Sequence, residues 1–439
     1  MNDIGRRQFV TSSLGTAAAA ASRSRALAAN DRITVGVMGL GNRGTSLVRD
    51  LARRDEVRIA YLCDVDAARF ERPLGLMDSA GLPPPKTVQD FRKALDDPGV
   101  DAVVVATNHH WQALATILAC QAGKDVYVEK PGSHDLNEAH KMVEAARKYD
   151  RVVQLGAQNR SAPYLHEARE YVRSGKLGDL HLVRVLSMNE GRVRAKGPDT
   201  PPPATLNWDM WCGPAPLQPY APGTWHINRF DFGLGRIVDD LVHQADLMRF
   251  VTGLGAPLSA TSTGGVYHYK DGREWPDTQL TTYEYPDLTL VFQSTLWAEA
   301  IRETPSVIRD GDQFPNWLMN GTKIELFGTD GMMLVGRQGG GWQVYDNDRK
   351  MVASTYGRGA GDRHMTNFLE CMRTRQRPIA DIEDTWKSML LCHLGSVSYR
   401  VGNRKLSYDA ETGWIKDDPE ANELMQRKGR SPWVIPDEV

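Results

Sequence analysis

The stretch Ile33-Thr34-Val35-Gly36-Val37-Met38-Gly39-Leu40-Gly41-Asn42-Arg43-Gly44 decides the fold of this chain. A short apolar run suits a buried strand, and the glycines that follow it have the spacing Gly-x-Gly-x-x-Gly. In such a turn Gly39 permits the bend, Gly41 lets the backbone approach a pyrophosphate, and Gly44 lets the helix pack close to the strand. The stretch therefore predicts a dinucleotide-binding turn between a strand and a helix.

The segments after this turn alternate between strand-like and helix-like patterns. Strands that alternate with helices predict a parallel sheet wound on both faces. We therefore expect an α/β Rossmann nucleotide-binding domain over residues 30–157. Its predicted strands are 33–38, 57–63, 102–106, 125–128 and 152–155, and its predicted helical stretches are 45–53, 88–95, 111–122 and 136–149.

Beyond residue 157 short strand-like runs follow one another without helices between them. This order predicts an α+β domain, residues 158–439, built on a large mixed or antiparallel sheet and closed by C-terminal helices. The length of 439 residues agrees with two domains of ordinary size. The predicted strands are 181–188, 258–267, 279–285, 288–296, 323–327 and 332–335, and the predicted helices are 235–250, 363–374 and 382–401.

Asp64 ends the second predicted strand, where a dinucleotide-binding domain places an acidic residue. Its carboxylate would accept hydrogen bonds from ribose hydroxyls, and its charge would repel a 2′-phosphate. The sequence therefore favours NAD over NADP as the cofactor. The alternative is an ordinary solvated carboxylate at a strand end.

Glu129-Lys130-Pro131 follows the predicted strand 125–128, at the sheet edge that faces the ligand crevice in a doubly wound fold. A half-enclosed lysine there can donate to a substrate hydroxyl and move a proton as hydride leaves carbon. We predict this role for Lys130, although a lysine is more often only a solvated charge.

The predicted helix 235–250 carries Asp239, His243 and Asp246 at positions i, i+4 and i+7. This spacing places the three side chains on one helix face, with apolar residues on the other faces. The pattern predicts a polar stripe held against the crevice. The alternative is a solvated surface stripe with a capping histidine.

With these motifs the chain resembles the glucose-fructose oxidoreductase, inositol dehydrogenase and rhizopine-catabolism (Gfo/Idh/MocA) family of NAD(P)-dependent oxidoreductases. The residues that carry the resemblance include Ala106-Thr107 and Gln158-Asn159-Arg160, besides the motifs above. The runs 207–216 and 328–331 look like landmarks of the family's exported bacterial branch. The resemblance covers nearly all of the chain after the N-terminal segment and says little about the substrate.

The resemblance implies that Lys130, Asp239 and His243 are the catalytic residues. His243 would be the general acid or base at the reacting hydroxyl, and Asp239 would orient it or share its proton. The family usually has glycine two residues before the histidine, whereas this chain has Leu241, preceded by a second acid, Asp240. The choice between Asp239 and Asp240 therefore stays open, and Asn108, where proline is common, indicates a different turn beneath the nicotinamide.

Flat aromatic faces bury the apolar side of a pyranose while polar groups fix its hydroxyls, although a tryptophan is more often a core residue than a ligand contact. The candidate substrate residues are Trp208, Trp211, Trp225, His226, Arg229 and Asp246.

The nucleotide site should combine the glycine turn with residues at the ends of the following strands. His110 is expected to line the nicotinamide pocket. We expect no metal site, because the adjacent His109 and His110 on an extended turn point apart. The candidate cofactor-binding residues are Gly39, Gly41, Asn42, Arg43, Gly44, Asp64, Thr107, Asn108, His110, Glu129, Lys130 and Gln158.

The N-terminal segment predicts export. Arg6-Arg7 is followed by a weakly apolar run and by Ala26-Leu27-Ala28, the order of a twin-arginine signal peptide with its cleavage site, here residues 1–29. We therefore expect a periplasmic protein that uses the twin-arginine export machinery. The alternative is a disordered or membrane-anchoring N-terminus.

Charge and cysteine content limit the partners. Lys+Arg 53 against Asp+Glu 55 gives no electrostatic reason to expect nucleic acid as a partner. The five cysteines show no paired spacing and are predicted to be buried free thiols. The family resemblance implies a homodimer or homotetramer.

Together these features predict an oxidoreductase that moves hydride between a tightly bound nicotinamide and a secondary hydroxyl of a sugar, glycoside or polyol. The alternative is a redox-neutral NAD-dependent glycosidase or lyase that acts through a transient keto-sugar. A sugar-binding protein without catalysis is a further alternative, disfavoured by the intact Lys130, Asp239 and His243.

Overall fold

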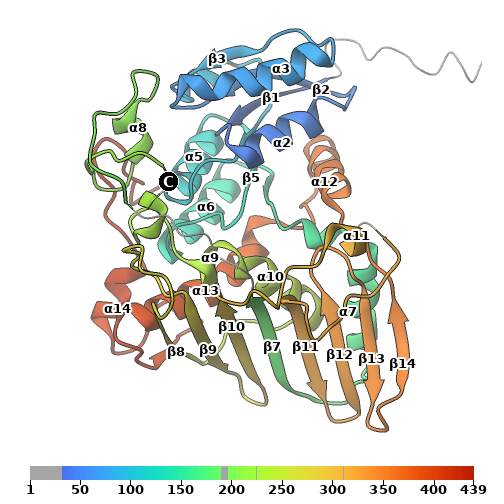
Figure 1. Cartoon of the computed structure of the whole chain (residues 1–439). Coiled ribbons are helices and arrows are strands. Elements are labelled where there is room, and N and C mark those ends of the chain that lie inside the picture. Colours follow the sequence, from blue (N-terminus) through green and yellow to red (C-terminus); the bar gives the residue numbers. More distant parts are fainter. Residues whose placement is uncertain (1–31, 189–195, 224, 310) are drawn as a thin grey trace, which may run out of the picture.

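The computed structural model describes residues 32–188, 196–223, 225–309 and 311–439. The predicted signal peptide, residues 1–29, lies outside these ranges. Two sheets lie one above the other with helices between them, and the C-terminus returns to the first domain (Figure 1). None of the helices in the described ranges is long and apolar enough to cross a lipid bilayer.

The first sheet has six parallel strands in the order β3-β2-β1-β4-β5-β6, as the Rossmann prediction requires. The chain order reverses between β1 and β4, where a doubly wound sheet opens its ligand crevice. The predicted helix 88–95 is wrong in part, because β3 and a short α4 (Arg92–Leu95) occupy this region. The strands are β1 Ile33–Met38, β2 Val57–Cys63, β3 Lys86–Val88, β4 Ala102–Val105, β5 Asp125–Val128 and β6 Val153–Leu155.

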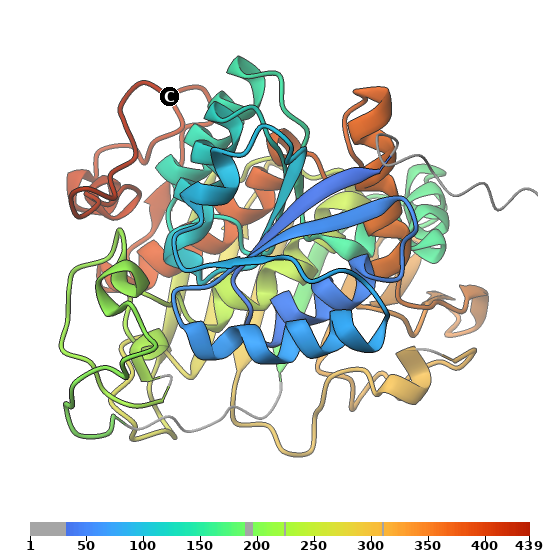
Figure 2. The same cartoon turned by 90° about the horizontal axis from the view of Figure 1, so that it is seen from above.

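Helices cover both faces of this sheet, which is why β1, β4, β5 and β6 are buried along their whole length. Figure 2 shows from above how helices flank the strands. One face packs against α2, α3 and α12, and the other against α5 and α6. These helices are α2 Asn42–Leu51, α3 Glu71–Ser79, α5 His109–Gln121, α6 Leu136–Lys148 and α12 Gly361–Thr374.

The second sheet has nine strands in the order β14-β13-β12-β11-β7-β10-β9-β8-β15. It is mixed, because β10 runs parallel to β7 while the other pairs are antiparallel. The sequence missed β13, β14 and β15. The strands are β7 Leu180–Met188, β8 Ser259–Gly265, β9 Thr278–Glu284, β10 Thr289–Thr295, β11 Thr322–Gly328, β12 Gly331–Gly336, β13 Trp342–Asp346, β14 Met351–Thr355 and β15 Leu406–Ser407.

Around β9 one face of the second sheet is covered and the other is open. Along β9 the residues Gln279, Thr281 and Tyr283 are buried, while their neighbours Leu280 and Thr282 are exposed. The covering helices are α7 (Pro163–Arg173), α10 (Leu241–Thr252) and α13 (Ile382–Arg400), and they lie between the two sheets (Figure 1). The open face is where a second copy could pack, and the predicted homo-oligomer stays a prediction.

The predicted helix 235–250 is interrupted at Asp240. It consists of a short α9 (Arg236–Asp239) followed by α10, and Asp240 has φ −112° and ψ −43° at the junction. The buried Asp240 carboxylate accepts a hydrogen bond from Ser187 at 2.6 Å and pairs with Arg337 at 2.7 Å. These contacts hold the junction, so Asp239 does not continue the face of α10.

The remaining short elements lie mostly at the edges of the two domains. α12, which sequence analysis placed with the second domain, packs through Phe368 and Leu369 against the first sheet. All five cysteines are buried and free, as predicted. The short elements are η2 Ala67–Phe70, η3 Gln158–Ser161, α8 Trp208–Cys212, η4 Trp225–Asn228, α11 Ser306–Arg309 and α14 Pro419–Leu424.

Several histidines are buried in this fold, and burial lowers their pKa. The pKa falls to about 3 for His393 and to about 4 for His364. Burial likewise lowers the pKa of His134 well below its usual range. Below about pH 6.5 the unfolded chain takes up protons on these rings that the folded chain does not, so acid removes stability.

We predict that lowering the pH from 6.5 towards 4 destabilises the protein, and that His393→Gln weakens this dependence. Each buried neutral histidine should contribute about 1.4 kcal/mol per pH unit in this window. Urea unfolding at a series of pH values measures the slope. An unchanged slope in His393→Gln would contradict the prediction.

Candidate active site

The glycine turn is shaped to receive a pyrophosphate. Gly39 has φ +83°, and a Cβ on Gly44 would lie 1.8 Å from the carbonyl oxygen of Gly39, so only glycine permits this approach of α2 to the turn. A Cβ on Gly41 would meet nothing within 4 Å, which leaves open space above the turn. No side chain caps the first turn of α2, so its amide groups are available to an anion.

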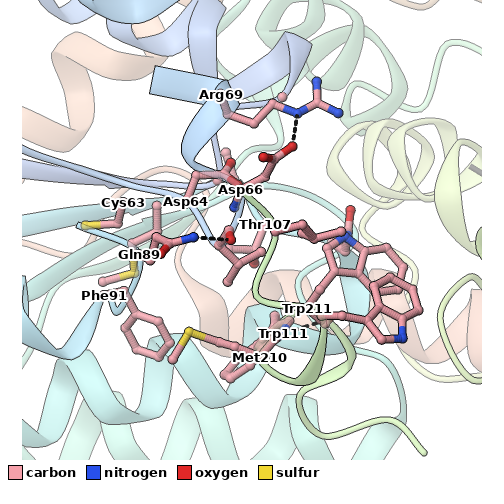
Figure 3. A pocket seen from close by; sticks show the side chains of 18 of the residues that line it. Cys63, Asp64, Asp66, Arg69, Gln89, Phe91, Thr107, Trp111, Met210 and Trp211 are labelled. Carbon is pink, nitrogen blue, oxygen red and sulfur yellow. Dashed lines mark hydrogen bonds and ion pairs between the residues drawn. The ribbon is translucent and has the colours of Figure 1, made fainter. Parts of the chain in front are cut away.

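A cavity of about 380 Å³ opens beside this turn, at the carboxyl ends of β1, β2 and β4. This volume lies within the range of small-molecule sites. Its first wall includes Gly39, Gly41, Asp64 and Thr107, and Figure 3 shows the side chains of Asp64 and Thr107 at this wall. The Thr107 hydroxyl is buried and has no hydrogen-bond partner within the described residues. These features fit a bound dinucleotide.

Asp64 lines the cavity and already holds the local backbone. Its two carboxylate oxygens accept hydrogen bonds from the amides of Leu40 at 2.6 Å and Asp66 at 2.9 Å. Burial raises the pKa of Asp64, and these two hydrogen bonds oppose the rise. Each carboxylate oxygen can accept a second hydrogen bond, so a ribose hydroxyl fits beside the backbone contacts.

The second wall comes from the segment 203–215, which follows β7 in the sequence. Backbone hydrogen bonds from Ala67 to Thr205 and from Asn207 to Val65, both 2.9 Å, fasten this segment to the first domain. Gln89 donates to the carbonyls of Val65 and Thr205 at 2.8 Å. The segment therefore closes over the cavity.

The C-terminal tail fastens the far end of the same segment. Arg430 donates to the carbonyls of Gly213 at 3.1 Å and Ala215 at 3.2 Å, and it pairs with Asp209 at 2.7 Å. Gly213 packs so closely on Trp111 that a Cβ there would lie 2.2 Å from the indole ring. The segment is thus held from both sides, although Arg430 does not line the cavity.

The candidate sugar-binding residues fall into different places. Trp208 and Trp211 stack at 4.6 Å and line the same cavity as Gly39 and Asp64, so they face the nucleotide crevice. Arg229 pairs with Glu274 at 3.0 Å. The side chains of Trp225 and His226 lie outside the described part of the chain. A contact between any of these residues and a sugar stays a prediction.

Three predicted cofactor-binding residues form one hydrogen-bond network. Glu129 accepts from Arg43 at 2.7 Å and from Gln158 at 3.2 Å, and Gln158 also donates to Tyr127 at 2.9 Å. Asn42 begins α2 and accepts from Arg72 at 3.4 Å. The network ties the glycine-turn helix to the end of β5, next to Lys130.

Lys130 is the second residue after β5 and contacts Asp239 of α9. Its Nζ donates to Oδ1 of Asp239 at 2.9 Å and to the carbonyl of Asp239 at 2.7 Å. His109, the residue after the cavity-lining Asn108, places Nε2 3.1 Å from the same Oδ1. Partial burial would raise the pKa of Asp239, whose side chain keeps some exposure to solvent, but the charge of Lys130 and the hydrogen bond from His109 hold it well below its usual range.

The structure separates the two adjacent acids. Asp239 contacts Lys130, whereas Asp240 points to Ser187 and Arg337. Within the described residues the Asp239 carboxylate, which was expected to orient His243, accepts a hydrogen bond from Lys130 instead. Burial together with the charges of Arg337 and Lys130 lowers the pKa of His243 well below its usual range, so this imidazole is neutral.

Two predicted positions need correction. Asp246 does not face the crevice, because its carboxylate forms a buried bidentate pair with Arg160 at 2.7 and 2.8 Å and accepts from Ser388 at 2.8 Å. His110 is fully buried, bonds to the carbonyl of Trp211 at 2.9 Å, and has its pKa lowered to about 3 by burial, so it packs behind the cavity wall.

Sequence reasoning considered His109 only as a possible metal ligand. Its place at the first position of α5, directly after β4, was the signal that could have identified it, because β4 ends at the crevice edge. In the described ranges no group of three histidine, cysteine or acidic side chains is arranged to hold a metal ion.

Comparison with known families matches two separate parts of the chain. Residues 33–157 match the NAD-binding Rossmann fold of the oxidoreductase family GFO_IDH_MocA, and residues 342–435 match the C-terminal alpha/beta domain of the same family. The two matched regions lie in the order in which the two sheets follow each other.

Individual relatives are more distant. A glycosyl hydrolase family 109 protein of Stenotrophomonas maltophilia is 34% identical over 28% of this chain and only 29% of its own length. A myo-inositol 2-dehydrogenase of Thermotoga maritima is 24% identical over 65% of this chain and 81% of its own. The crystal structure of a levoglucosan dehydrogenase with NADH and levoglucosan has the same fold, with TM-score 0.64, 16% identity, and coverage of 85% of this chain and 98% of that one.

We predict that Asp246→Ala destabilises the fold by about 3–5 kcal/mol, because the buried Arg160 loses its only buried partner and keeps only the half-exposed Asp384. Substrate affinity of the folded protein should not change. Chemical unfolding and KM check the two expectations, with Glu170→Ala in the exposed pair to Arg173 as a control that should change stability by less than about 1 kcal/mol. A raised KM with unchanged stability would place Asp246 at the substrate after all.

Proposed function

Because the chain carries both domains of the Gfo/Idh/MocA oxidoreductase family, we propose that it is an NAD-dependent oxidoreductase acting on a secondary hydroxyl of a sugar, glycoside or polyol. The proposal rests above all on one arrangement of side chains. Lys130 is held by the carboxylate of Asp239. This pair lies next to the nucleotide cavity, because His109, which also contacts Asp239, directly follows the cavity-lining residues Thr107 and Asn108.

Lys130, Asp239 and His243 would have different roles in the reaction. Bound nicotinamide would supply the hydride acceptor for the carbinol carbon. Lys130, oriented by Asp239, would donate a hydrogen bond to the reacting oxygen, and the neutral His243 would accept the hydroxyl proton as the carbonyl forms. In the reverse direction His243 would return that proton to the oxygen.

Asp64 and the glycine turn would position the nucleotide. The carboxylate at the end of β2 suits the ribose hydroxyls of NAD and disfavours a 2′-phosphate. Arg69 also lines the cavity, and its Nε lies 3.7 Å from Oδ2 of Asp66, which is a long distance for an ion pair. The ratio of the affinities for NADH and NADPH therefore measures whether the negative charge of Asp64 outweighs the positive charge of Arg69 at the ribose end of the site.

The substrate class is supported by the names of similar proteins. One relative is a myo-inositol dehydrogenase and one structural neighbour was crystallised with levoglucosan, a polyol and an anhydrosugar. A second candidate function, redox-neutral cleavage of a glycoside through a transient keto-sugar, is favoured by the similarity to a glycosyl hydrolase family 109 protein. Product analysis separates them: a keto-sugar with stoichiometric NADH indicates a dehydrogenase, and a cleaved glycoside without net NADH indicates a hydrolase or lyase.

We also propose that the protein is exported by the twin-arginine route with NAD already bound. Outside the cytosol no pool of nucleotide replaces lost cofactor, so retention through purification requires nanomolar affinity, about −12 kcal/mol. The closed segment 203–215 supports slow release, because nucleotide exchange would require it to open. Such an enzyme would oxidise and re-reduce its cofactor in a closed cycle.

We predict that Lys130→Met abolishes turnover while NADH affinity changes little, because the lysine acts on the substrate oxygen. Isothermal titration with NADH and turnover assays over a panel of sugars measure the two effects. Lys130→Arg tests whether a positive charge alone suffices. Near-normal activity of Lys130→Met with any accepted sugar would end the assignment of its role.

We predict that protein purified from the periplasm without added nucleotide contains bound NAD. We also predict that Arg430→Ala increases the rates of both NADH association and NADH dissociation by about tenfold. Losing hydrogen bonds worth about 1.4 kcal/mol would open the segment more often without removing a cavity contact. Stopped-flow fluorescence of NADH measures both rates, with Arg173→Ala as a surface control. If only dissociation became faster, the substitution would have weakened contacts with the nucleotide and not the closure of the segment. Protein recovered from the periplasm without NAD would refute the prediction that the cofactor stays bound.

A further inference from the structure

His109 shares the acceptor atom that holds Lys130. Its Nε2 lies 3.1 Å from Oδ1 of Asp239, and Nζ of Lys130 lies 2.9 Å from the same oxygen. The three side chains come from three places in the fold: the start of α5, the second residue after β5, and the end of α9. They meet because β4 and β5 are neighbouring strands and Asp239 at the end of α9 contacts both His109 and Lys130.

The tautomer of His109 follows from its surroundings. Asp239 is ionised and can only accept hydrogen bonds, so Nε2 of His109 must carry the hydrogen. Nδ1 of His109 is buried and has no hydrogen-bond partner within the described residues. Nε2 is therefore the ring nitrogen through which His109 acts on Asp239.

Without His109 the Asp239 carboxylate would be free to turn. Its side chain is 45% exposed, whereas those of His109 and Lys130 are 20% and 24% exposed. An exposed carboxylate with one cationic partner gains by rotating into water, because ion pairs near solvent are weak. A second, rigid donor on the same oxygen opposes that rotation.

We infer that His109 is a positioning residue of the reaction: it fixes the Asp239 carboxylate so that this carboxylate keeps Lys130 aimed at the reacting oxygen. The inference rests on the proposed function for its effect on catalysis. Its effect on Lys130 is a property of the protein itself and can be measured without a substrate.

The first test labels Lys130 in the folded protein with a limiting amount of acetic anhydride and follows its peptide by mass spectrometry. In His109→Leu the loosened ion pair should make Lys130 react at least three times faster than in the wild type. His109→Gln, whose amide can donate to Asp239, should restore the wild-type rate. The exposed Lys350 should react equally in all variants. An unchanged or slower rate for Lys130 in His109→Leu overturns the inference, whatever the substrate proves to be.

The second test is a double-mutant cycle on turnover. His109→Leu should lower kcat by ten- to a hundredfold with little change in KM or NADH affinity, and His109→Gln should recover most of it. In an Asp239→Asn background His109→Leu should have almost no further effect, because it acts through Asp239. Additive losses would show that His109 acts independently. An inactive wild type with every sugar would refute the proposed function and leave the labelling result to decide the inference.

Discussion

A contact between two backbones, too close for any side chain, determines where the site forms. Gly44 lies against the carbonyl of Gly39, so α2 starts directly above the end of β1 with its first amide groups uncapped. Because β1 is next to β4 at the point where the strand order reverses, the carboxyl ends of β2, β4 and β5 converge around this turn. Asp64 and Thr107 are brought into one cavity by that convergence and not by their spacing in the sequence.

Around this crevice two neighbouring acids have different roles because the chain turns between them. Asp240 is buried with Arg337 and Ser187 and stabilises the junction of α9 and α10, whereas Asp239 pairs with Lys130. A buried carboxylate must be paired, and its partners therefore fix the backbone that carries it. Asp240, which stabilises the junction, therefore also fixes the direction in which Asp239 points, and Asp239 in turn orients Lys130.

Three parts of the chain that are distant in sequence together form the nucleotide site. The first domain supplies the glycine turn, the segment 203–215 supplies the opposite wall, and the C-terminal tail fastens that segment through Arg430. Such an enclosure makes release of the nucleotide depend on local opening as well as on direct contacts. This property would suit an enzyme that works away from a supply of free cofactor.

The sequence by itself determined the Rossmann domain, the mixed second sheet, Asp64 at the end of β2 and Lys130 after β5, because these follow from local periodicity and from the rule that ligands bind at the carboxyl ends of parallel strands. It could not determine the break at Asp240, since that break depends on Ser187 and Arg337 from other strands. For the same reason helical spacing placed Asp246 on the crevice, although Arg160 holds it in the core, and His109 was overlooked in favour of His110. Spacing along a helix fixes which side chains share a face, but only tertiary packing decides which partner each charged group finds.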